Sequence, residues 1–233
     1  MGWLQLYKKT PTAGVEPARP EGPELATRCN NHYAMWACKI GEMMGYKVFL
    51  TKIYKFDNVD LCMGDLKILF LNAGYCLGID GSTVDYILKS YRYVYCSKKT
   101  RNEIYSKVKG LILRESPDLF CMAEVDKGSL NTGFENQILK LTSKKESFFD
   151  ISVKYGEDSL LRKFPLSSGK SNGFISKEKV KFKKLYFKNG AKKLIYEIYI
   201  KGFTILLAHF SLKKKVRKKQ FDEIADLMKG RKK

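Results

Sequence analysis

Three short apolar runs, each ending in a polar residue, constrain the fold of this chain more than any other feature. The runs at 68–71, 120–123 and 205–208 lead directly into Asn72, Glu124 and His209. Continuous apolar runs of this length are typical of strands buried on both faces. In layered α/β proteins, ligands bind at the carboxyl ends of such strands. We therefore expect Asn72, Glu124 and His209 to meet at one rim of a sheet.

Between and after these runs the apolar periodicity alternates between that of helices and that of strands. We expect helices that begin at Ser82, at Thr100 and at Asn136, and a last one over 216–228. Pro117 marks the end of the second helix, and Phe134, Ile138 and Leu141 are expected on one face of the third. Further strands are predicted over 148–155, 172–176, 180–188 and 194–200. Asn189-Gly190 between the last two strands is a strong hairpin signal. The order of these predicted helices and strands along the chain predicts an α/β fold in which helices cover a mixed sheet.

Residues 1–62 differ from the rest of the chain. Residues 1–35 carry four of the six prolines and show no periodicity, and the composition then shifts to Lys, Ile, Tyr and Phe. Residues 46–56 could form a strand, but it has no clear partner in the sequence. Met63 stands just ahead of the first core strand. We therefore predict a poorly organised extension over 1–62, hypothesise that much of it is a misassigned start or non-coding read-through, and place the folded domain at 63–233. N-terminal sequencing of the native product tests this hypothesis.

The formal net charge of +20 favours polyanionic partners such as nucleic acid, phosphorylated ligands or an anionic membrane surface. AT-rich coding, with lysines that merely solvate the surface, is an equal alternative. The six cysteines form no CxxC pair and the chain has two histidines, so no zinc spacing is present. No signal peptide and no apolar run of about 20 residues is visible. We expect a soluble protein of the reducing cytoplasm without a membrane span.

The three strand ends carry different chemistry. Glu124 is a natural ligand for a hard cation such as Mg²⁺, although a surface acid at a loop start explains it as well. Asparagine is common at the end of a strand, where its side chain can form a hydrogen bond with the backbone of a turn, so Asn72 has a structural explanation too. A lone histidine such as His209 is more often structural than catalytic. Together, a carboxylate, an amide and an imidazole with a metal suit a phosphate ester.

Four segments, in order, resemble the motifs of the endonuclease/exonuclease/phosphatase family, which has the DNase I-like fold. They are LKILFLNAGY, ESPDLFCMAEVDKGS, SNGFISK and ILLAHFSLKKKVRKKQ, which lie within 66–228. The resemblance implies a layered β-sandwich flanked by helices. It also implies a hydrolase of phosphoric ester bonds that uses Mg²⁺ or Mn²⁺. The family includes DNA and RNA nucleases, lipid phosphodiesterases and inositol phosphatases, and the basic net charge favours a nuclease that cleaves phosphodiester bonds of nucleic acid.

The same resemblance implies roles for individual residues. Asn72 and Glu124 would bind or orient the metal, and His209 and Asn172 would contact the scissile phosphate. Lys213, Lys214, Lys215 and Arg217 are the candidate nucleic-acid-binding residues, and Gln220 matches the glutamine that follows in the last motif. The usual Gln before the Glu is Ala123 here.

The family's later motifs, Gly-Asp-x-Asn and Ser-Asp-His, are absent from this sequence, and no His follows His209. We therefore expect a domain truncated at its C-terminus, with half of the two-layered sandwich missing and with little activity of its own. Two alternatives remain: a basic nucleic-acid-binding module without catalysis, and a truncated or frame-shifted product with no stable fold.

Overall fold

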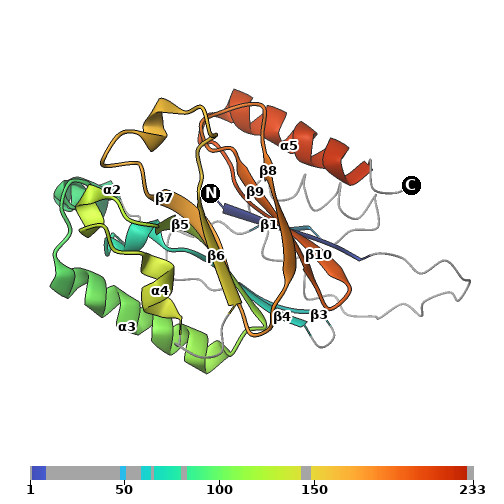
Figure 1. Cartoon of the computed structure of the whole chain (residues 1–233), viewed down its shortest axis with the longest axis horizontal. Helices are drawn as coiled ribbons and strands as arrows, with labels where there is room; N and C mark the ends of the chain where they lie inside the picture. Colours follow the sequence, from blue (N-terminus) through green and yellow to red (C-terminus); the bar gives the residue numbers. More distant parts are fainter. Residues whose placement is uncertain are drawn as a thin grey trace, which may run out of the picture.

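The computed structural model describes residues 2–8, 48–50, 59–63, 66–79, 83–142 and 148–229. Its strands form two five-stranded sheets (Figure 1). The first sheet has the order β2 (Val48–Leu50), β1 (Gly2–Lys8), β10 (Phe203–His209), β9 (Leu194–Ile200) and β8 (Lys181–Tyr186). The second has the order β3 (Val59–Met63), β4 (Leu66–Asn72), β5 (Leu119–Asp126), β7 (Lys170–Ser176) and β6 (Phe148–Val153).

In the described ranges, four α-helices accompany the sheets: α2 (Thr83–Leu88), α3 (Lys98–Glu115), α4 (Gln137–Leu141) and α5 (Lys214–Lys229). The loops of the same ranges contain four short 3-10 turns: η1 (Gly74–Cys76), η2 (Ser90–Tyr93), η3 (Leu130–Thr132) and η4 (Leu160–Arg162). None of the helices in the described ranges is long and apolar enough to cross a membrane.

The alternation of side chains along the strands explains the layering. In β4, Ile68 and Phe70 belong to a core shared with Tyr196, Ile198 and Leu207 of the other sheet. Leu69 and Leu71 point the opposite way, into a second core with α3 and α4. A third core lies between the other face of the first sheet and α5, and it includes Ile224 and Met228. The protein is therefore a mixed α/β structure in which two packed sheets carry helices on both outer faces.

Most of the elements expected after residue 66 are present. The predicted helix at Thr100 begins two residues earlier, because Ser97 caps it by accepting a hydrogen bond from the Thr100 amide, and it ends before Pro117. The hairpin around Asn189-Gly190 is confirmed, since β8 and β9 pair antiparallel. Phe134 does not share the α4 face with Ile138, because it lies outside that helix and its side chain is exposed. The helix expected from Ser82 corresponds to α2, which begins at Thr83, and Ser82 itself lies outside the described residues.

Three strands come from the segment predicted to be poorly organised. β1 pairs with β10 over seven residues and with β2, and β3 pairs with β4 over five. The pairing of β1 with β10 joins segments that lie far apart in the sequence, so local patterns do not reveal it. The boundary of the folded domain at residue 63 stays a prediction. The remainder of 1–62 lies outside the described residues. The expectation that half of the sandwich would be missing was wrong, since a second five-stranded sheet is present.

Candidate functional site

Four of the residues predicted to form a site lie together at one end of the sandwich. Asn72 is opposite Ala123 in the parallel β4–β5 pair, which places it beside Glu124. On the other side of β5, the Asn172 Oδ1 atom of β7 accepts a hydrogen bond of 3.3 Å from the Glu124 amide. His209 comes from the other sheet, with Nε2 3.5 Å from Glu124 Oε1. The structure therefore joins Asn72, Glu124, Asn172 and His209 at one rim.

An irregularity in β5 sets the direction of Glu124. The register against β7 shifts between Met122 and Val125, and Glu124 adopts a left-handed backbone conformation with φ 55°. Ala123 faces the core between the sheets, whereas Met122 and Val125 both face the helices. Regular alternation would have sent Glu124 under the helices, so the bulge resets the pattern and frees this carboxylate to reach His209. β-bulges often re-aim a side chain next to a binding site.

Lys192 stands between Glu124 and His209 and was not predicted. Its Nζ atom is 2.8 Å from His209 Nε2 and 3.6 Å from Glu124 Oε1. An ammonium group only donates, so Nε2 accepts and the imidazole proton belongs on Nδ1. Burial, reinforced by Lys192 and Lys154, holds the pKa of His209 well below its usual value, so the ring is neutral at pH 7. Within the described part of the chain, the buried Nδ1 atom has no hydrogen-bond partner.

The backbone near Lys192 explains its position. Tyr155, which follows β6, forms an isolated bridge with Lys192, and the Lys193 amide donates to the Lys154 carbonyl at 2.7 Å. These contacts join the two sheets at this end. From α5, Gln220 donates to the carbonyls of Lys192 and Asn189 at 2.9 Å and accepts from the Ser211 amide at 2.9 Å. Gln220 therefore has a positioning role that fixes the hairpin against the end of β10.

Two further lysines, Lys154 and Lys170, lie buried around Tyr75 on the other side of Glu124. Lys154 donates to the Tyr75 hydroxyl, and Lys170 Nζ lies 3.9 Å from the centre of the Tyr75 ring. Burial lowers the pKa of Lys154 to about 7, although the charge of Glu124 opposes the shift. Lys170 is paired with Asp126, with Nζ 3.2 Å from Oδ2. At pH 7 Lys154 therefore carries only about half a positive charge, while Lys170 and Lys192 balance Asp126 and Glu124.

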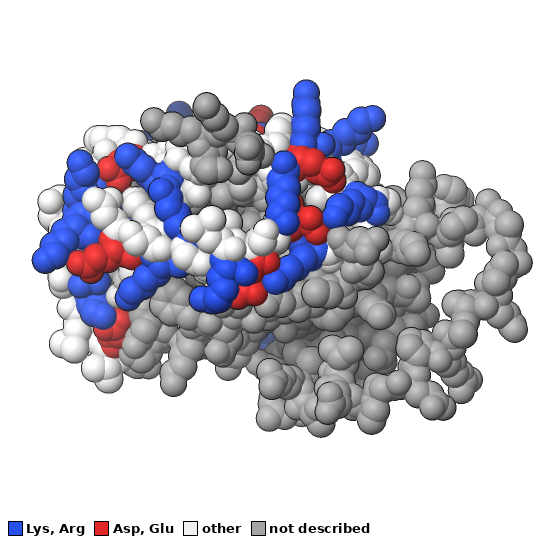
Figure 2. All heavy atoms as spheres, turned by 90° about the horizontal axis from the view of Figure 1, so that it is seen from below, with Lys and Arg blue, Asp and Glu red and all other residues white. Residues whose placement is uncertain are grey.

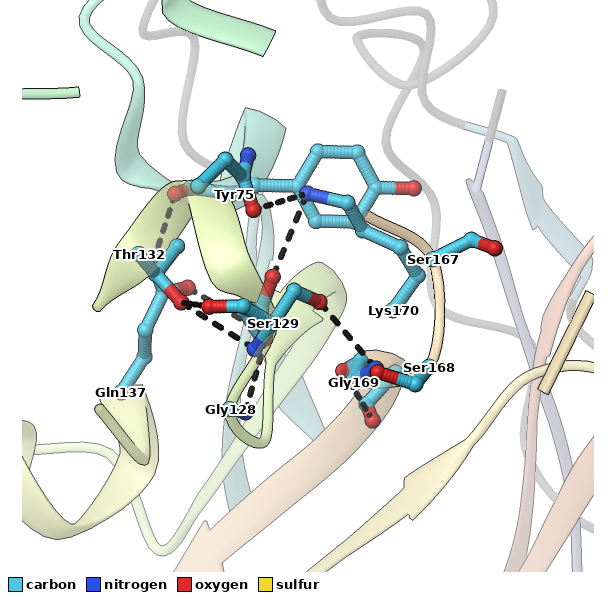
Figure 3. A network of polar contacts seen from close by, with 12 residues as sticks. Tyr75, Gly128, Ser129, Thr132, Gln137, Ser167, Ser168, Gly169 and Lys170 are labelled. Atoms are coloured by element: carbon cyan, nitrogen blue, oxygen red, sulfur yellow. Dashed lines mark hydrogen bonds and ion pairs between the residues drawn. The ribbon is translucent and has the colours of Figure 1, made fainter. Parts of the chain in front are cut away.

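A polar network fixes this lysine side of the site (Figure 3). Ser129 Oγ accepts from the Gly169 amide at 3.1 Å, directly before Lys170. Gln137 is fully buried and bridges β5 to η1, because it accepts from the Asp126 amide at 2.9 Å and donates to the Tyr75 carbonyl at 2.6 Å. A side chain at Gly169 would collide with Asp126 Oδ1, since a Cβ there would lie 2.4 Å from it. The hydrogen bonds that Ser129 and Gln137 make to Gly169, Asp126 and Tyr75 are all buried, which strengthens them.

The other predicted residues have identifiable surroundings. Asn72 Oδ1 accepts a hydrogen bond of 3.2 Å from the Gly74 amide. This is the structural role in a turn that was the alternative to a role as a metal ligand. Asn172 is buried, and its Nδ2 atom has no hydrogen-bond partner in the described ranges. Lys213, Lys214 and Lys215 are exposed at the start of α5. Arg217 is buried and donates to the carbonyls of Ser211 and Leu212 at 3.2 and 3.0 Å, so it stabilises that loop.

The donor set around Glu124 suits one hard cation with few protein ligands. Glu124 meets Lys192 and His209 through Oε1, which leaves Oε2 for a metal. The described residues contain no group of three His, Cys, Asp or Glu side chains that could enclose an ion. Mg²⁺ is commonly held by one or two carboxylates, with waters and substrate phosphate completing its shell. Glu124 fits that mode of binding, with Asn72 beside it.

Sequence reasoning missed the three lysines for a simple reason. Lys and Arg number 44 in this chain, so no single lysine stands out. Lys192 could have been suspected because it follows the Asn189-Gly190 turn, whereas Lys154 and Lys170 carry no comparable signal. No protein-family model, curated protein or solved structure matches this chain.

Proposed function

We propose that this chain is a divalent-metal-dependent phosphoesterase of the endonuclease/exonuclease/phosphatase type, and that its four layers follow the DNase I-like arrangement. The observation that carries the proposal is the meeting of Asn72, Glu124, Asn172 and His209 at one rim, on strands from both sheets. These are the residues that the motif resemblance assigns to metal and phosphate. The bulge that turns Glu124 towards His209 adds support, because it departs from the regular strand.

Each residue has a chemical role in this proposal. Glu124 holds the cation through Oε2, and Asn72 lies beside it. The bound cation supplies charge that polarises the phosphoryl oxygen. Lys192 and the unpartnered Asn172 Nδ2 atom donate to phosphate oxygens. His209 is 1% exposed, so it reaches a phosphate only when Lys192 turns away from Nε2.

The 233 residues contain neither the Gly-Asp-x-Asn nor the Ser-Asp-His motif. We therefore expect metal binding to be intact and hydrolysis to be slow, because loss of a general base commonly reduces the rate by several orders of magnitude. A direct measurement of metal binding is then a sharper test than turnover.

The test measures Mn²⁺ binding by calorimetry and hydrolysis of bis-nitrophenyl phosphate with Mg²⁺, Mn²⁺ or a chelator. Glu124→Gln should abolish Mn²⁺ binding and the metal-dependent hydrolysis. Glu178→Gln is the matched control, because Glu178 is an exposed acid in the loop after β7. Equal Mn²⁺ binding by the wild type and Glu124→Gln would refute the proposal. Rapid turnover that depends on Glu124 would instead refute the expectation that these 233 residues hydrolyse the substrate slowly.

Nucleic acid is the proposed substrate class, supported by the exposed lysines at the start of α5. Figure 2 shows Lys and Arg spread over the face that carries α3, with Asp and Glu between them, rather than gathered in one stripe. The lysines at the start of α5 are therefore the better candidates for contacts with the phosphate backbone of a nucleic acid. Labelled DNA and RNA oligonucleotides should bind with an affinity that falls steeply with salt, and Lys213→Glu with Lys215→Glu should weaken that binding. Affinity that does not change with salt would remove this part of the proposal.

A further inference from the structure

Large apolar side chains are exposed on three segments next to the candidate site. We call these segments, 84–95, 130–134 and 160–164, the apolar rim. Ile87 in α2 is 69% exposed, Phe134 after η3 is 65% exposed and Leu160 in η4 is 78% exposed. Within 84–95 alone, Val84, Leu88 and Val94 are exposed to a similar extent. Exposed apolar groups on this scale usually mark an interaction surface.

Backbone contacts hold the three segments together. The Cys96 amide donates to the Asn131 carbonyl at 3.1 Å, which joins the first segment to the second. The Leu130 amide donates to the Pro165 carbonyl at 3.1 Å, which joins the second to the third. Figure 1 shows α2 and the loop that leads into β7 at the same end of the molecule, on the left. The apolar rim is therefore one surface.

This surface adjoins the candidate site. Asn131 lies within the rim, and its Oδ1 atom accepts from Lys170 Nζ at 3.3 Å. Arg92, also in the rim, donates to the Leu77 carbonyl at 2.9 Å, two residues after Tyr75. A partner that covers the rim would thus lie next to the lysine side of the site.

The charges around the rim are mainly positive. Lys98, Lys99, Lys127 and Lys163 are exposed, and no ion pair with another described residue is found for them. The acids Asp85 and Glu135 are paired, with Lys89 at 2.5 Å and with Arg101 at 3.1 Å. Glu103, one turn after Lys99 in α3, and Glu157 and Asp158 are exposed acids nearby. Four exposed lysines against three exposed acids favour an anionic partner.

We propose that the apolar rim docks peripherally onto an anionic lipid bilayer. The most exposed rim side chains, Leu160, Ile87 and Leu88, are aliphatic, and aliphatic groups enter hydrocarbon but do not stack on bases. Tyr86, Tyr91 and Tyr95 lie among them, and tyrosine is enriched at the boundary between lipid and water. The lysines supply attraction to anionic headgroups. This docking does not depend on the proposed phosphoesterase activity.

Co-sedimentation of the full chain with vesicles tests the docking. We expect binding to phosphatidylcholine vesicles that contain about 30% phosphatidylserine, and binding at least tenfold weaker without the anionic lipid, because each lysine near such a surface contributes about fivefold. Ile87→Ser with Leu160→Ser should weaken binding at least tenfold. Leu113→Ser is the matched control, since Leu113 is 80% exposed on α3 outside the rim, and it should bind like the wild type. Thermal unfolding of each variant confirms that the fold is kept.

Several outcomes would overturn the docking. These are wild-type chain that stays in the supernatant, rim variants that sediment like the wild type, and a control variant that loses as much binding as they do. A single-stranded oligonucleotide that binds the wild type but not the rim variants would assign the rim to nucleic acid instead. A wild-type dimer that the rim substitutions convert to monomer would assign it to self-association. Mn²⁺ binding at Glu124 reports on the phosphoesterase proposal separately.

Discussion

At the scale of single residues, Glu124 combines a strained backbone with a partly buried carboxylate. A non-glycine residue in the left-handed region costs about 1–3 kcal/mol and persists where the surrounding structure holds it. Here the neighbours that hold it are β4 and β7 on either side of the bulge. The strain and the aim of the carboxylate have the same cause, because the bulge that produces the positive φ also points Glu124 towards His209.

A pair of substitutions separates these two contributions. Glu124→Gln removes the charge and keeps the strain, whereas Glu124→Gly removes both. We expect Glu124→Gly to have a free energy of unfolding about 1 kcal/mol higher than Glu124→Gln, because glycine adopts positive φ without the Cβ penalty. Urea denaturation measures the difference. The same pair at Glu178, where φ is not positive, should show the reverse order, and the same order at both positions would contradict the strain argument.

Lys154 predicts a pH dependence of stability. Its pKa is about 7 in the folded protein, because of burial, against 10.5 for an ordinary lysine. Between about pH 7 and pH 10 the unfolded chain therefore binds more protons than the folded one, and stability relative to Lys154→Met should rise with pH. The slope is at most about 1.4 kcal/mol per pH unit.

Urea denaturation of the wild type and Lys154→Met across this pH range measures the effect. Lys218→Met is the control, because Lys218 is exposed on α5 and its ammonium group keeps its water. If the difference in unfolding free energy between the wild type and Lys154→Met did not change with pH, the pKa of Lys154 would not be lowered by folding.

At the scale of elements, the β8–β9 hairpin positions Lys192 through a close contact with α5. Gly190 has φ 91°, and a Cβ there would lie 2.8 Å from Val216 Cγ1 and 2.9 Å from Gln220 Nε2. Gly190→Ala should therefore destabilise the protein by roughly 2–4 kcal/mol, from the φ penalty and the overpacking together. Gly202→Ala in the β9–β10 turn shares the positive φ but has open space, so it should cost about 1 kcal/mol. Equal losses in thermal unfolding would show that the α5 contact is not tight.

The elements themselves were largely predictable because their signals are local. The apolar runs before Asn72, Glu124 and His209 lie in β4, β5 and β10, although β5 continues past Glu124 to Asp126, and the Asn189-Gly190 turn joins β8 and β9 as expected. Partner choice is not local, so the pairing of β1 with β10 could not be read from the sequence. The bulge at Glu124 was also hidden, since nothing in the run around it departs from an ordinary strand. Four of the predicted residues therefore lie together, whereas Lys192 was missed because a bridge to Tyr155 across the two sheets brings it there.

At the scale of the whole molecule, the strands β1 and β3 close edges of the two sheets. β3 covers the outer side of β4, and β1 covers the outer side of β10. Removing residues 1–62 would delete β1, β2 and nearly all of β3, and would leave one edge of β4 and one edge of β10 without a paired strand. Exposed edges of long apolar strands are templates for aggregation. The N-terminal segment therefore has a stabilising role in this fold, whatever the origin of its coding sequence.

This role predicts the behaviour of a shortened chain. A chain of residues 63–233 should unfold at a lower temperature than the full chain and should self-associate, because β4 and β10 each lose a paired neighbour. Light scattering after gel filtration and thermal unfolding measure both effects for the two chains side by side. A chain that begins at residue 48 is the intermediate control, since it keeps β3 on β4 and leaves only β10 open; it should fall between the other two. If the shortened chain were instead monomeric and as stable as the full chain, residues 63–233 would form the complete folded unit, and the pairing of β1 with β10 would contribute nothing to stability.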